Sequence, residues 1–472
     1  MSSGERVHLE NSQIEQEQAE LEEGVVMPSD LIYGLEARPP VREAIFAAFQ
    51  HVLASFIGII TPSLIIGGAL GLEPEAAAYL VSMSLFVSGI ATFIQAKRIG
   101  PVGSGLLSIQ GTSFAFIGPI LAVGGGAVAA GAEPTEALGL IFGMCLVGSF
   151  IEMIFSRFLH LASRVITPLV TGTVVTLIGL TLINVGITAV GGGFPAIEAG
   201  TFGSPQNLGL AALVLVIIVA LNSVNNSFLR MSSIAIGLLV GYIVAVFTGL
   251  ISFGNLLGNG PVFALPIPFR FGFGFQLASF IPFAFLYLIT TIESIGDLTA
   301  TSSITGEPIK GEKYFKRIQG GVLADGINSF IAACFNTFPN TTFSQNNGVI
   351  QLTGIGSRYV GYFIAGIFVI LGLFPVVGSV LQAIPQPVLG GATLIMFGTV
   401  AAAGIKILST VNFTKRSAII LATSLGLGLG VTFSPELLEA TPPLVKSIFS
   451  SGISTGGLCA LLLNIVLPGP RD

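Results

Sequence analysis

Fourteen apolar runs follow one another through this 472-residue sequence and constrain its fold more than any other feature. A helix needs about 20 predominantly apolar residues to cross the hydrocarbon core of a bilayer. Only 9% of the residues are charged, against about 25% in a soluble domain. We therefore predict an all-α polytopic membrane protein with fourteen spans, at residues 44–70, 76–96, 103–122, 135–156, 164–187, 207–228, 232–252, 278–301, 319–335, 337–354, 359–377, 387–405, 416–433 and 447–467.

The Lys and Arg residues between these spans predict the orientation, because cytoplasmic loops carry an excess of both. If the N-terminus is cytoplasmic, the outer loops contain only Arg270 and Lys446. The inner loops contain Lys97, Arg98, Arg157, Arg164, Arg230, Lys310, Lys313, Lys316, Arg317, Arg358, Lys406, Lys415 and Arg416. We expect a multi-pass protein of the plasma (inner) membrane with both termini in the cytoplasm.

An internal repeat supports the same count. Residues 168–179 in span five resemble residues 387–398 in span twelve, because Pro, Gly and Gly recur at a constant offset of 219 residues. Each half then has seven spans, an odd number, so the second half enters the membrane from the opposite side. This 7+7 inverted repeat pairs span three with span ten, and both are interrupted by Gly and Pro. Paired interrupted spans indicate a substrate site near the midplane, formed by short extended segments.

Composition excludes several other classes of function. The formal net charge is −5, and much of the acidity lies in residues 1–40, which we predict to be a disordered cytoplasmic tail. The sequence shows no basic face for nucleic acid. The three cysteines lie in apolar stretches, which favours packing over a metal site. Without a zinc spacing, a phosphate loop or a nucleophile elbow, we expect neither a cofactor nor an enzyme.

Three of the carboxylates inside predicted spans lie in spans eight and nine, where each ionised group costs about 2.5–3.5 kcal/mol on insertion scales. Glu293 and Asp297 are four residues apart and share one face of span eight, and Asp325 lies in span nine. We interpret Glu293 as a ligand-binding residue, and Asp297 and Asp325 as proton-coupling or structural residues. His51 in span one is either a proton relay or a packed, hydrogen-bonded side chain. Glu152, near the inner end of span four, is expected at the membrane interface.

Amide and aromatic side chains gather at the two interrupted spans. Planar amides offer paired donors and acceptors, and aromatic rings can stack on a flat ligand. These features suit a neutral planar heterocycle with ring N–H and carbonyl groups. The alternative is that the polar groups only cap broken helices and the rings only pack. The candidates are Ser113, Phe114, Phe343, Ser344, Gln345 and Asn346.

The motifs resemble those of the nucleobase–ascorbate transporter family, in the same order along the chain. They are Gln50-His51, Glu293 with Asp297, the Gly-Val-Leu-Ala-Asp-Gly run at 321–326, and Gln-Asn-Asn-Gly at 345–348 followed by Thr353. The resemblance extends from about residue 40 to the C-terminus. The Gln-Asn-Asn-Gly form is similar to the xanthine and uric acid permease branch, whereas uracil permeases tend to carry Glu at position 345 and His at position 297.

This resemblance implies a domain organisation and a mechanism. A core domain would comprise residues 41–160 and 276–380, and a gate domain residues 161–255 and 381–468. The family also implies a homodimer and an elevator-like movement of the core against the gate. The implied activity is proton-coupled uptake of xanthine and/or uric acid, with sodium left open as the driving ion.

The resemblance also implies residue roles. Glu293 and Gln345 would bind the purine edge, Phe114 and Phe343 would flank its plane, and Ser344 would add backbone contacts. Asp297 and Asp325 would support the site and the coupling, and Asn346 would tune selectivity. Ser113 stands where xanthine-selective members carry Asn, so the smaller side chain leaves room for uric acid.

Two rival transport functions are a uracil or other pyrimidine permease and an anion exchanger of the same 7+7 architecture. Carboxylates in mid-membrane argue against an anion path. A third class, a membrane-embedded enzyme, lacks a nucleophile–base constellation.

Overall fold

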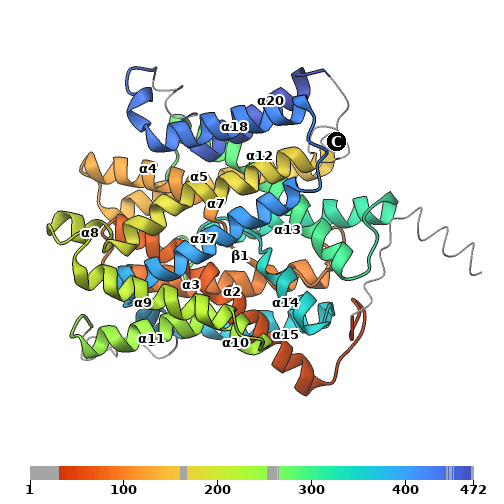
Figure 1. The fold of residues 1–472 in the computed structure, drawn as a ribbon, viewed down its shortest axis with the longest axis horizontal. Coiled ribbons are helices and arrows are strands. Elements are labelled where there is room, and N and C mark those ends of the chain that lie inside the picture. Colours follow the sequence, from red (N-terminus) through yellow and green to blue (C-terminus); the bar gives the residue numbers. More distant parts are fainter. Residues whose placement is uncertain are drawn as a thin grey trace, which may run out of the picture.

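The computed structural model describes residues 31–159, 167–251, 263, 265–442, 445, 449 and 451–468. It is helical, apart from two short strands (Figure 1). The first half contains α2 (Val41–Ala69), α3 (Pro74–Lys97), β1 (Gln110–Thr112), η1 (Phe114–Phe116), α4 (Ile117–Ala129), α5 (Pro134–Phe155), η2 (Ser156–Phe158), α7 (Pro168–Val190), α8 (Gly193–Glu198), α9 (Pro205–Asn222), α10 (Ser227–Met231) and α11 (Ser233–Phe247). The second half contains α12 (Leu277–Ile304), α13 (Gly311–Cys334), β2 (Asn340–Thr342), α14 (Gln345–Thr353), α15 (Arg358–Leu373), α16 (Pro375–Gln382), α17 (Gln386–Leu408), α18 (Lys415–Phe433), η4 (Pro435–Leu438) and α20 (Gly452–Val466).

Within the described residues, eight helices are long and apolar enough to cross a membrane, or nine if α15 and the helix after its 82° bend count as one span. The chain is therefore a multi-pass membrane protein, and the count of fourteen stays a prediction. The remaining predicted spans are not among these helices because they are too short or too polar. Helices α4, α11 and α20 are short, α13 begins with a charged turn, and α14 has only nine residues.

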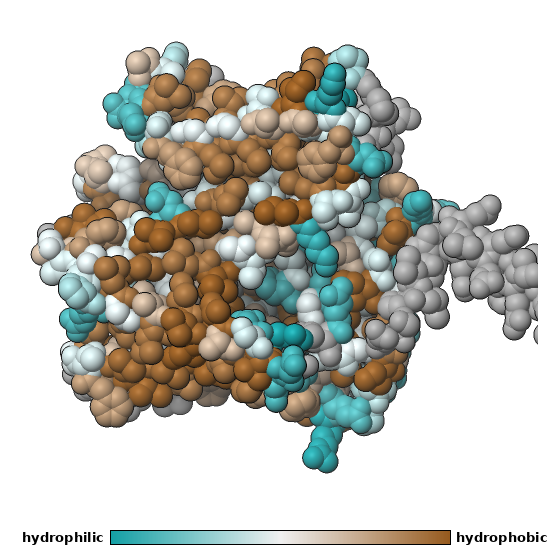
Figure 2. All heavy atoms as spheres, in the orientation of Figure 1, coloured by the Kyte–Doolittle hydropathy of each residue, from teal (hydrophilic) through white to brown (hydrophobic). Residues whose placement is uncertain are grey.

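The outer surface agrees with burial in lipid. Figure 2 shows hydrophobic side chains over much of the face formed by α9 and α11, and hydrophilic ones beside α14 and the start of α2. Leu239 and Phe247 on α11 are 60% and 86% exposed. Such exposure of large apolar side chains is unfavourable in water and ordinary against acyl chains.

One set of helices is organised around α7 and α17, which pack along each other in the middle of the molecule (Figure 1). Helices α9 and α11 pack on one side of this pair, and α18 and α20 on the other. Small residues permit the close approach: a β-carbon at Gly179 would lie 2.3 Å from the backbone nitrogen of Ala401. The prolines of the sequence repeat, Pro168 and Pro387, both lie in the first turn of these central helices, where proline is tolerated.

A second set of helices surrounds the strands β1 and β2. Here α3 packs on α15, and α5 packs on α13. The packing pairs among these helices have counterparts when α2, α3 and α5 are exchanged with α12, α13 and α15. For example, α2 packs on α3 as α12 packs on α13, and α2 packs on α15 as α12 packs on α5.

The two strands form an antiparallel pair, with Gly111 opposite Thr341. Backbone hydrogen bonds lengthen it at both ends, from Phe343 N to the Ile109 oxygen (3.0 Å) and from Ser113 N to the Pro339 oxygen (2.8 Å). The backbone before β1 is not helical, because residues such as Gly103 adopt positive φ (101°). Pairing satisfies backbone groups that extended segments would otherwise leave open in a buried position.

The predicted tail lies partly outside the described residues, which begin at position 31. The prediction of disorder is wrong for residues 31–40. Ile32 N donates a 2.8 Å hydrogen bond to the Gly354 oxygen, and Glu36 pairs with Arg358 at 2.7 Å. The segment is fixed because it supplies partners to the junction between α14 and α15.

Candidate functional site

Two phenylalanine rings mark the point where the strand pair meets its two following helices. Phe114 begins η1 after β1, and Phe343 follows β2 directly. Their centroids are 6.3 Å apart with an angle of 22° between the ring planes, and both side chains are buried. The backbone holds Phe343 in place, since a β-carbon at Gly111 would lie 2.5 Å from its Cζ atom. Near-parallel rings suit a flat partner.

Helix α14 begins beside these rings and carries the predicted amides. Ser344 is its N-cap residue, and Gln345 is its first residue and is half-buried. Asn346 is buried and donates from Nδ2 to the Leu107 oxygen (2.5 Å), so this amide braces the backbone that leads into β1. Asn347 Oδ1 accepts a hydrogen bond from Thr301 Oγ1 (2.7 Å), which joins α14 to α12.

Helix α12 contributes Glu293 and Asp297 and packs against both β2 and α14. Oε2 of Glu293 is buried and has no hydrogen-bond partner within the described part of the chain. Asp297 Oδ2 accepts a hydrogen bond from Thr342 Oγ1 of β2 (3.1 Å). The two acids therefore differ: Asp297 is hydrogen-bonded to the strand, whereas one oxygen of Glu293 has no hydrogen-bond partner among the described residues.

Asp325 on α13 is fully buried behind the strand pair. Its Oδ1 accepts from Gln95 Nε2 on α3 (3.0 Å), and its Oδ2 accepts from Ser294 Oγ on α12. Ser294 also lies 3.4 Å from Thr341 Oγ1 of β2. Asp325 thus links two helices and reaches the strand through one hydroxyl, at a position where a charge costs several kcal/mol.

Two predicted residues lie on the first-half side of the site. His51 on α2 is fully buried, lies beside Asn346, and has no hydrogen-bond partner at either ring nitrogen among the described residues. Ser113 is 1% exposed, and its hydroxyl likewise has no partner in the described ranges. Unpartnered buried polar groups are costly, so both side chains are candidates for contacts that the protein chain does not provide.

Sequence reasoning missed several residues of this region. Gln95 and Thr342 bond to the carboxylates, and Phe397 of α17 packs edge-on against Phe114 at 5.4 Å. Nor does the sequence clearly indicate that Glu152 is buried: α13 packs against α5 here and the side chain is 1% exposed, while its depth in the membrane stays a prediction. A glutamate within an otherwise apolar run at 145–155 was the only signal for this burial.

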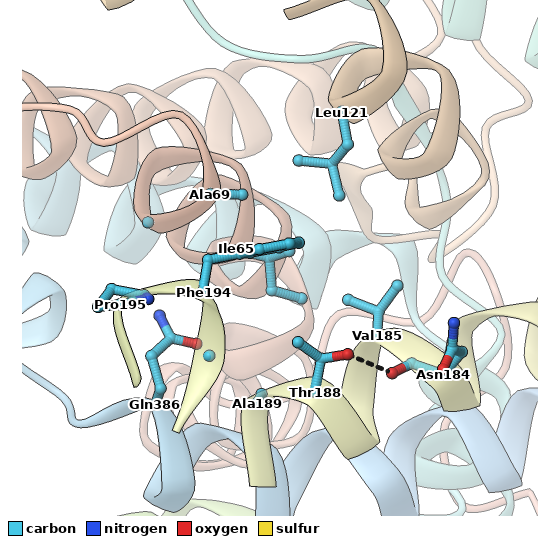
Figure 3. A pocket seen from close by; sticks show the side chains of 12 residues that line it. Ile65, Ala69, Leu121, Asn184, Val185, Thr188, Ala189, Phe194, Pro195 and Gln386 are labelled. Carbon is cyan, nitrogen blue, oxygen red and sulfur yellow. Dashed lines mark hydrogen bonds between the residues drawn. The ribbon is translucent and has the colours of Figure 1, made fainter. Parts of the chain in front are cut away.

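A cavity of about 230 Å³ lies between α2 and α4 on one side and α7, α8 and α17 on the other (Figure 3). Most of its lining is apolar, with Asn184, Thr188 and Gln386 as the polar members. Thr188 donates to the Asn184 carbonyl oxygen (3.0 Å), so its hydroxyl is satisfied within α7. The cavity lies between the two sets of helices, and none of the carboxylates lines it.

The arrangement combines a pair of near-parallel rings, a carboxylate oxygen without a hydrogen-bond partner among the described residues, and a half-buried amide at a helix N-terminus. A helix N-terminus also favours carbonyl oxygens and anions. None of these groups forms a nucleophile–base pair, and the described residues contain no cluster of three or more metal ligands. Fold and site together define a multi-pass membrane protein with a buried cluster of aromatic, amide and carboxyl side chains where its two strands meet.

Comparison with known proteins identifies the family. Residues 42–437 match the family model Xan_ur_permease, described as "Permease family". The chain is 48% identical over 444 residues to "Xanthine permease XanP" of Escherichia coli (strain K12), covering 94% of this chain and 96% of that protein. It is 47% identical over 441 residues to "Xanthine permease XanQ" of the same strain, covering 93% and 94%. The chain therefore belongs to this permease family, the nucleobase–ascorbate transporters, as the motifs predicted.

A solved structure shares the fold at low sequence identity. The transmembrane domain of the cyanobacterial bicarbonate transporter BicA superposes with a TM-score of 0.56 at 17% identity, covering 88% of this chain and 99% of that one. At this identity the likeness concerns the fold alone.

Proposed function

We propose that the chain is a proton-coupled uptake permease for xanthine and/or uric acid. The observation that carries the proposal is the near-parallel pair of Phe114 and Phe343 at the two interrupted segments, together with an unpartnered buried oxygen of Glu293 on α12 and the half-buried Gln345 at the start of α14. A purine offers a flat face to the rings, and N–H and carbonyl groups to the carboxylate and the amide. The names of the relatives XanP and XanQ support xanthine as a substrate.

The remaining candidate residues have supporting roles in this proposal. Ser344 contributes backbone contacts at the start of α14, and Asn346 tunes selectivity from behind by positioning the backbone at Leu107. Ser113 has a free hydroxyl and a small volume, which leaves room for the extra oxygen of uric acid. A uracil or other pyrimidine permease is not favoured by the relatives, and mid-membrane carboxylates argue against an anion exchanger.

Proton coupling is assigned to Asp297 and Asp325, with His51 as a supporting group. Both acids are bonded to hydroxyl or amide donors and lie where a net charge is unfavourable. Protonation neutralises the cluster, so the loaded site can cross a barrier of low dielectric constant. Sodium stays an open alternative as the driving ion, and no bound cofactor is required.

The movement that exposes this site is proposed to be elevator-like, in a fourteen-span inverted repeat. The matched packing of the two halves supports the repeat. The division into a core around β1 and β2 and a gate around α7 and α17 follows the proposed boundaries, and the cavity of Figure 3 lies between these two parts. We further propose a homodimer in the inner membrane with both termini in the cytoplasm.

The test is uptake of labelled xanthine and uric acid into cells that express the protein, with and without a protonophore. We expect accumulation of at least one purine, abolished by the protonophore and unaffected by sodium removal. Excess uracil should not compete. Failure of both purines to accumulate, or uptake that withstands the protonophore, would contradict the proposal.

A further inference from the structure

Glu152 is a buried acid that the site described above does not use. It lies on α5, is 1% exposed, and neither carboxyl oxygen has a hydrogen-bond partner within the described chain. Its surroundings are tightly packed. A β-carbon at Gly326 of α13 would lie 2.8 Å from the backbone nitrogen of Met153, and one at Gly148 would lie 2.2 Å from the Tyr287 ring of α12.

The titratable groups that face Glu152 come from the three elements packed around it. Helix α13 presents Asp325, helix α12 presents Glu293 and Tyr287, and α5 itself carries Cys145. Helix α4 contains no titratable residue. Arg157, the nearest cation along the chain, is exposed. Glu152 therefore faces two acids, and no described residue places a cation beside it. A third negative charge in this arrangement would be strongly unfavourable.

The hydroxyl groups around Glu152 are already committed as donors. Thr291 lies beside the carboxyl group but donates to the Tyr287 oxygen (2.8 Å), and Tyr287 donates to the Cys145 oxygen (2.7 Å). On α5 itself, Ser149 donates to the Leu146 oxygen (2.7 Å) and Ser156 to the Met153 oxygen (2.6 Å). These hydroxyls can accept a hydrogen bond, as Thr291 could from a protonated Glu152, but have no hydrogen left for a carboxylate.

We propose that Glu152 is a further proton-binding residue of the transport cycle, located behind Asp325. In the resting state it is the neutral carboxylic acid. During the cycle its proton moves to the Asp325 or Glu293 carboxylate, is released to water on one side of the membrane, and is replaced by a proton from water on the other. Each cycle thus moves one proton, and an emptied Glu152 leaves three like charges that disfavour movement of the unprotonated site. This inference rests on the proposed proton-coupled function.

The experiment uses the purified full-length protein in liposomes and separates exchange from accumulation. Exchange of internal for external labelled xanthine needs no net proton movement, whereas accumulation driven by a pH gradient does. For Glu152→Gln, which keeps the shape without the titrating group, we expect exchange within about twofold of wild type and gradient-driven accumulation at least about tenfold lower. The pH dependence of uptake should flatten. Glu136→Gln, at an exposed acid in the first turn of the same helix, should behave as wild type.

Three outcomes would overturn the inference. One is accumulation by Glu152→Gln with the wild-type pH profile, and another is an equal loss of exchange and accumulation, which would indicate a structural role. If Glu152→Gln does not fold, Glu152→Met is the second variant, since it fills a similar volume without a carboxyl group, and gradient-driven accumulation by it with the wild-type pH profile would overturn the inference. Failure of the proposed function is separate, because then the wild-type protein itself would neither exchange nor accumulate xanthine or urate.

Discussion

The segments around β1 and β2 have the same backbone design and different chemistry. Each places a short strand before a helix N-terminus and a phenylalanine at the turn. After β1 the chain continues into the apolar helix α4, whereas after β2 it continues into the amide-rich α14. The partner helices differ likewise: α12 and α13 carry acids in mid-helix, whereas α2 and α3 carry His51 and Gln95 there and have acids only in their first turns. A repeated architecture therefore supplies the geometry, and one half supplies most of the charged chemistry.

The largest effect is expected from a change to the acids of the second half of the chain. Glu293→Gln should lower purine uptake at least about 100-fold, because the amide cannot act as a charged acceptor and leaves a buried ligand donor poorly paired. Uptake of labelled xanthine at matched membrane expression is the measurement. Glu436→Gln, an exposed acid in η4, is the control and should transport normally. Normal uptake by Glu293→Gln would remove this residue from the site.

The next largest effect is expected from a change to the geometry of the strand pair. Gly111→Ala places a β-carbon 2.5 Å from Phe343 Cζ and 2.8 Å from Ile59 Cγ1, so the ring must shift. Overpacking of this kind costs about 1–3 kcal/mol, which corresponds to an increase of about 5- to 150-fold in the apparent KM. Gly118→Ala, in the following helix with no atom near the new methyl group, should leave the KM unchanged. Equal KM values for both variants would show that Phe343 does not need this position.

A smaller effect is expected on substrate preference, from a change on the first-half side of the site. Ser113→Asn should shift the preference from uric acid towards xanthine by about tenfold, because a larger side chain removes space on the first-half side of the site. Competition of unlabelled purines against labelled xanthine gives the ratio. The control is Ser434→Asn, because Ser434 is exposed and lies far along the chain. Ser104 would not serve as a control, because it is fully buried. An unchanged ratio would separate Ser113 from selectivity.

The smallest effect lies outside the membrane, at the loop between α12 and α13. Burial alone would raise the pKa of Glu307, but hydrogen bonds and charges from Arg317 and Lys313 outweigh burial and hold this pKa below its usual value. Its stabilising contribution is therefore complete above the ordinary glutamate pKa and is lost as the pH falls through the lowered one. Glu307→Gln should reduce thermal stability in detergent at neutral pH, with less than about a twofold effect on uptake. A destabilisation that persists unchanged in acid would contradict the ion-pair assignment.

Hydrophobic run lengths, the repeated Pro and Gly spacing, and the motif at 345–348 were sufficient to predict a helical membrane protein of this family. These signals are local, since lipid forces each spanning segment to satisfy its own backbone. The pairing of interrupted segments followed from the repeat, because equivalent elements meet about a symmetry axis. The site residues that could be predicted were those that break an apolar pattern, such as Glu293 and Asp325.

Only the tertiary structure decided which polar groups face one another. The sequence does not reveal that Gln95 and Ser294 bond to Asp325, or that Asn346 braces Leu107, because the partners lie on other elements. It also does not reveal that Glu152 is buried, since the exposure of a residue near a helix end depends on the helices beside it, and α13 packs against α5 there. The position of a residue along its own helix can be counted from the sequence, whereas its burial depends on how far the adjacent helices extend.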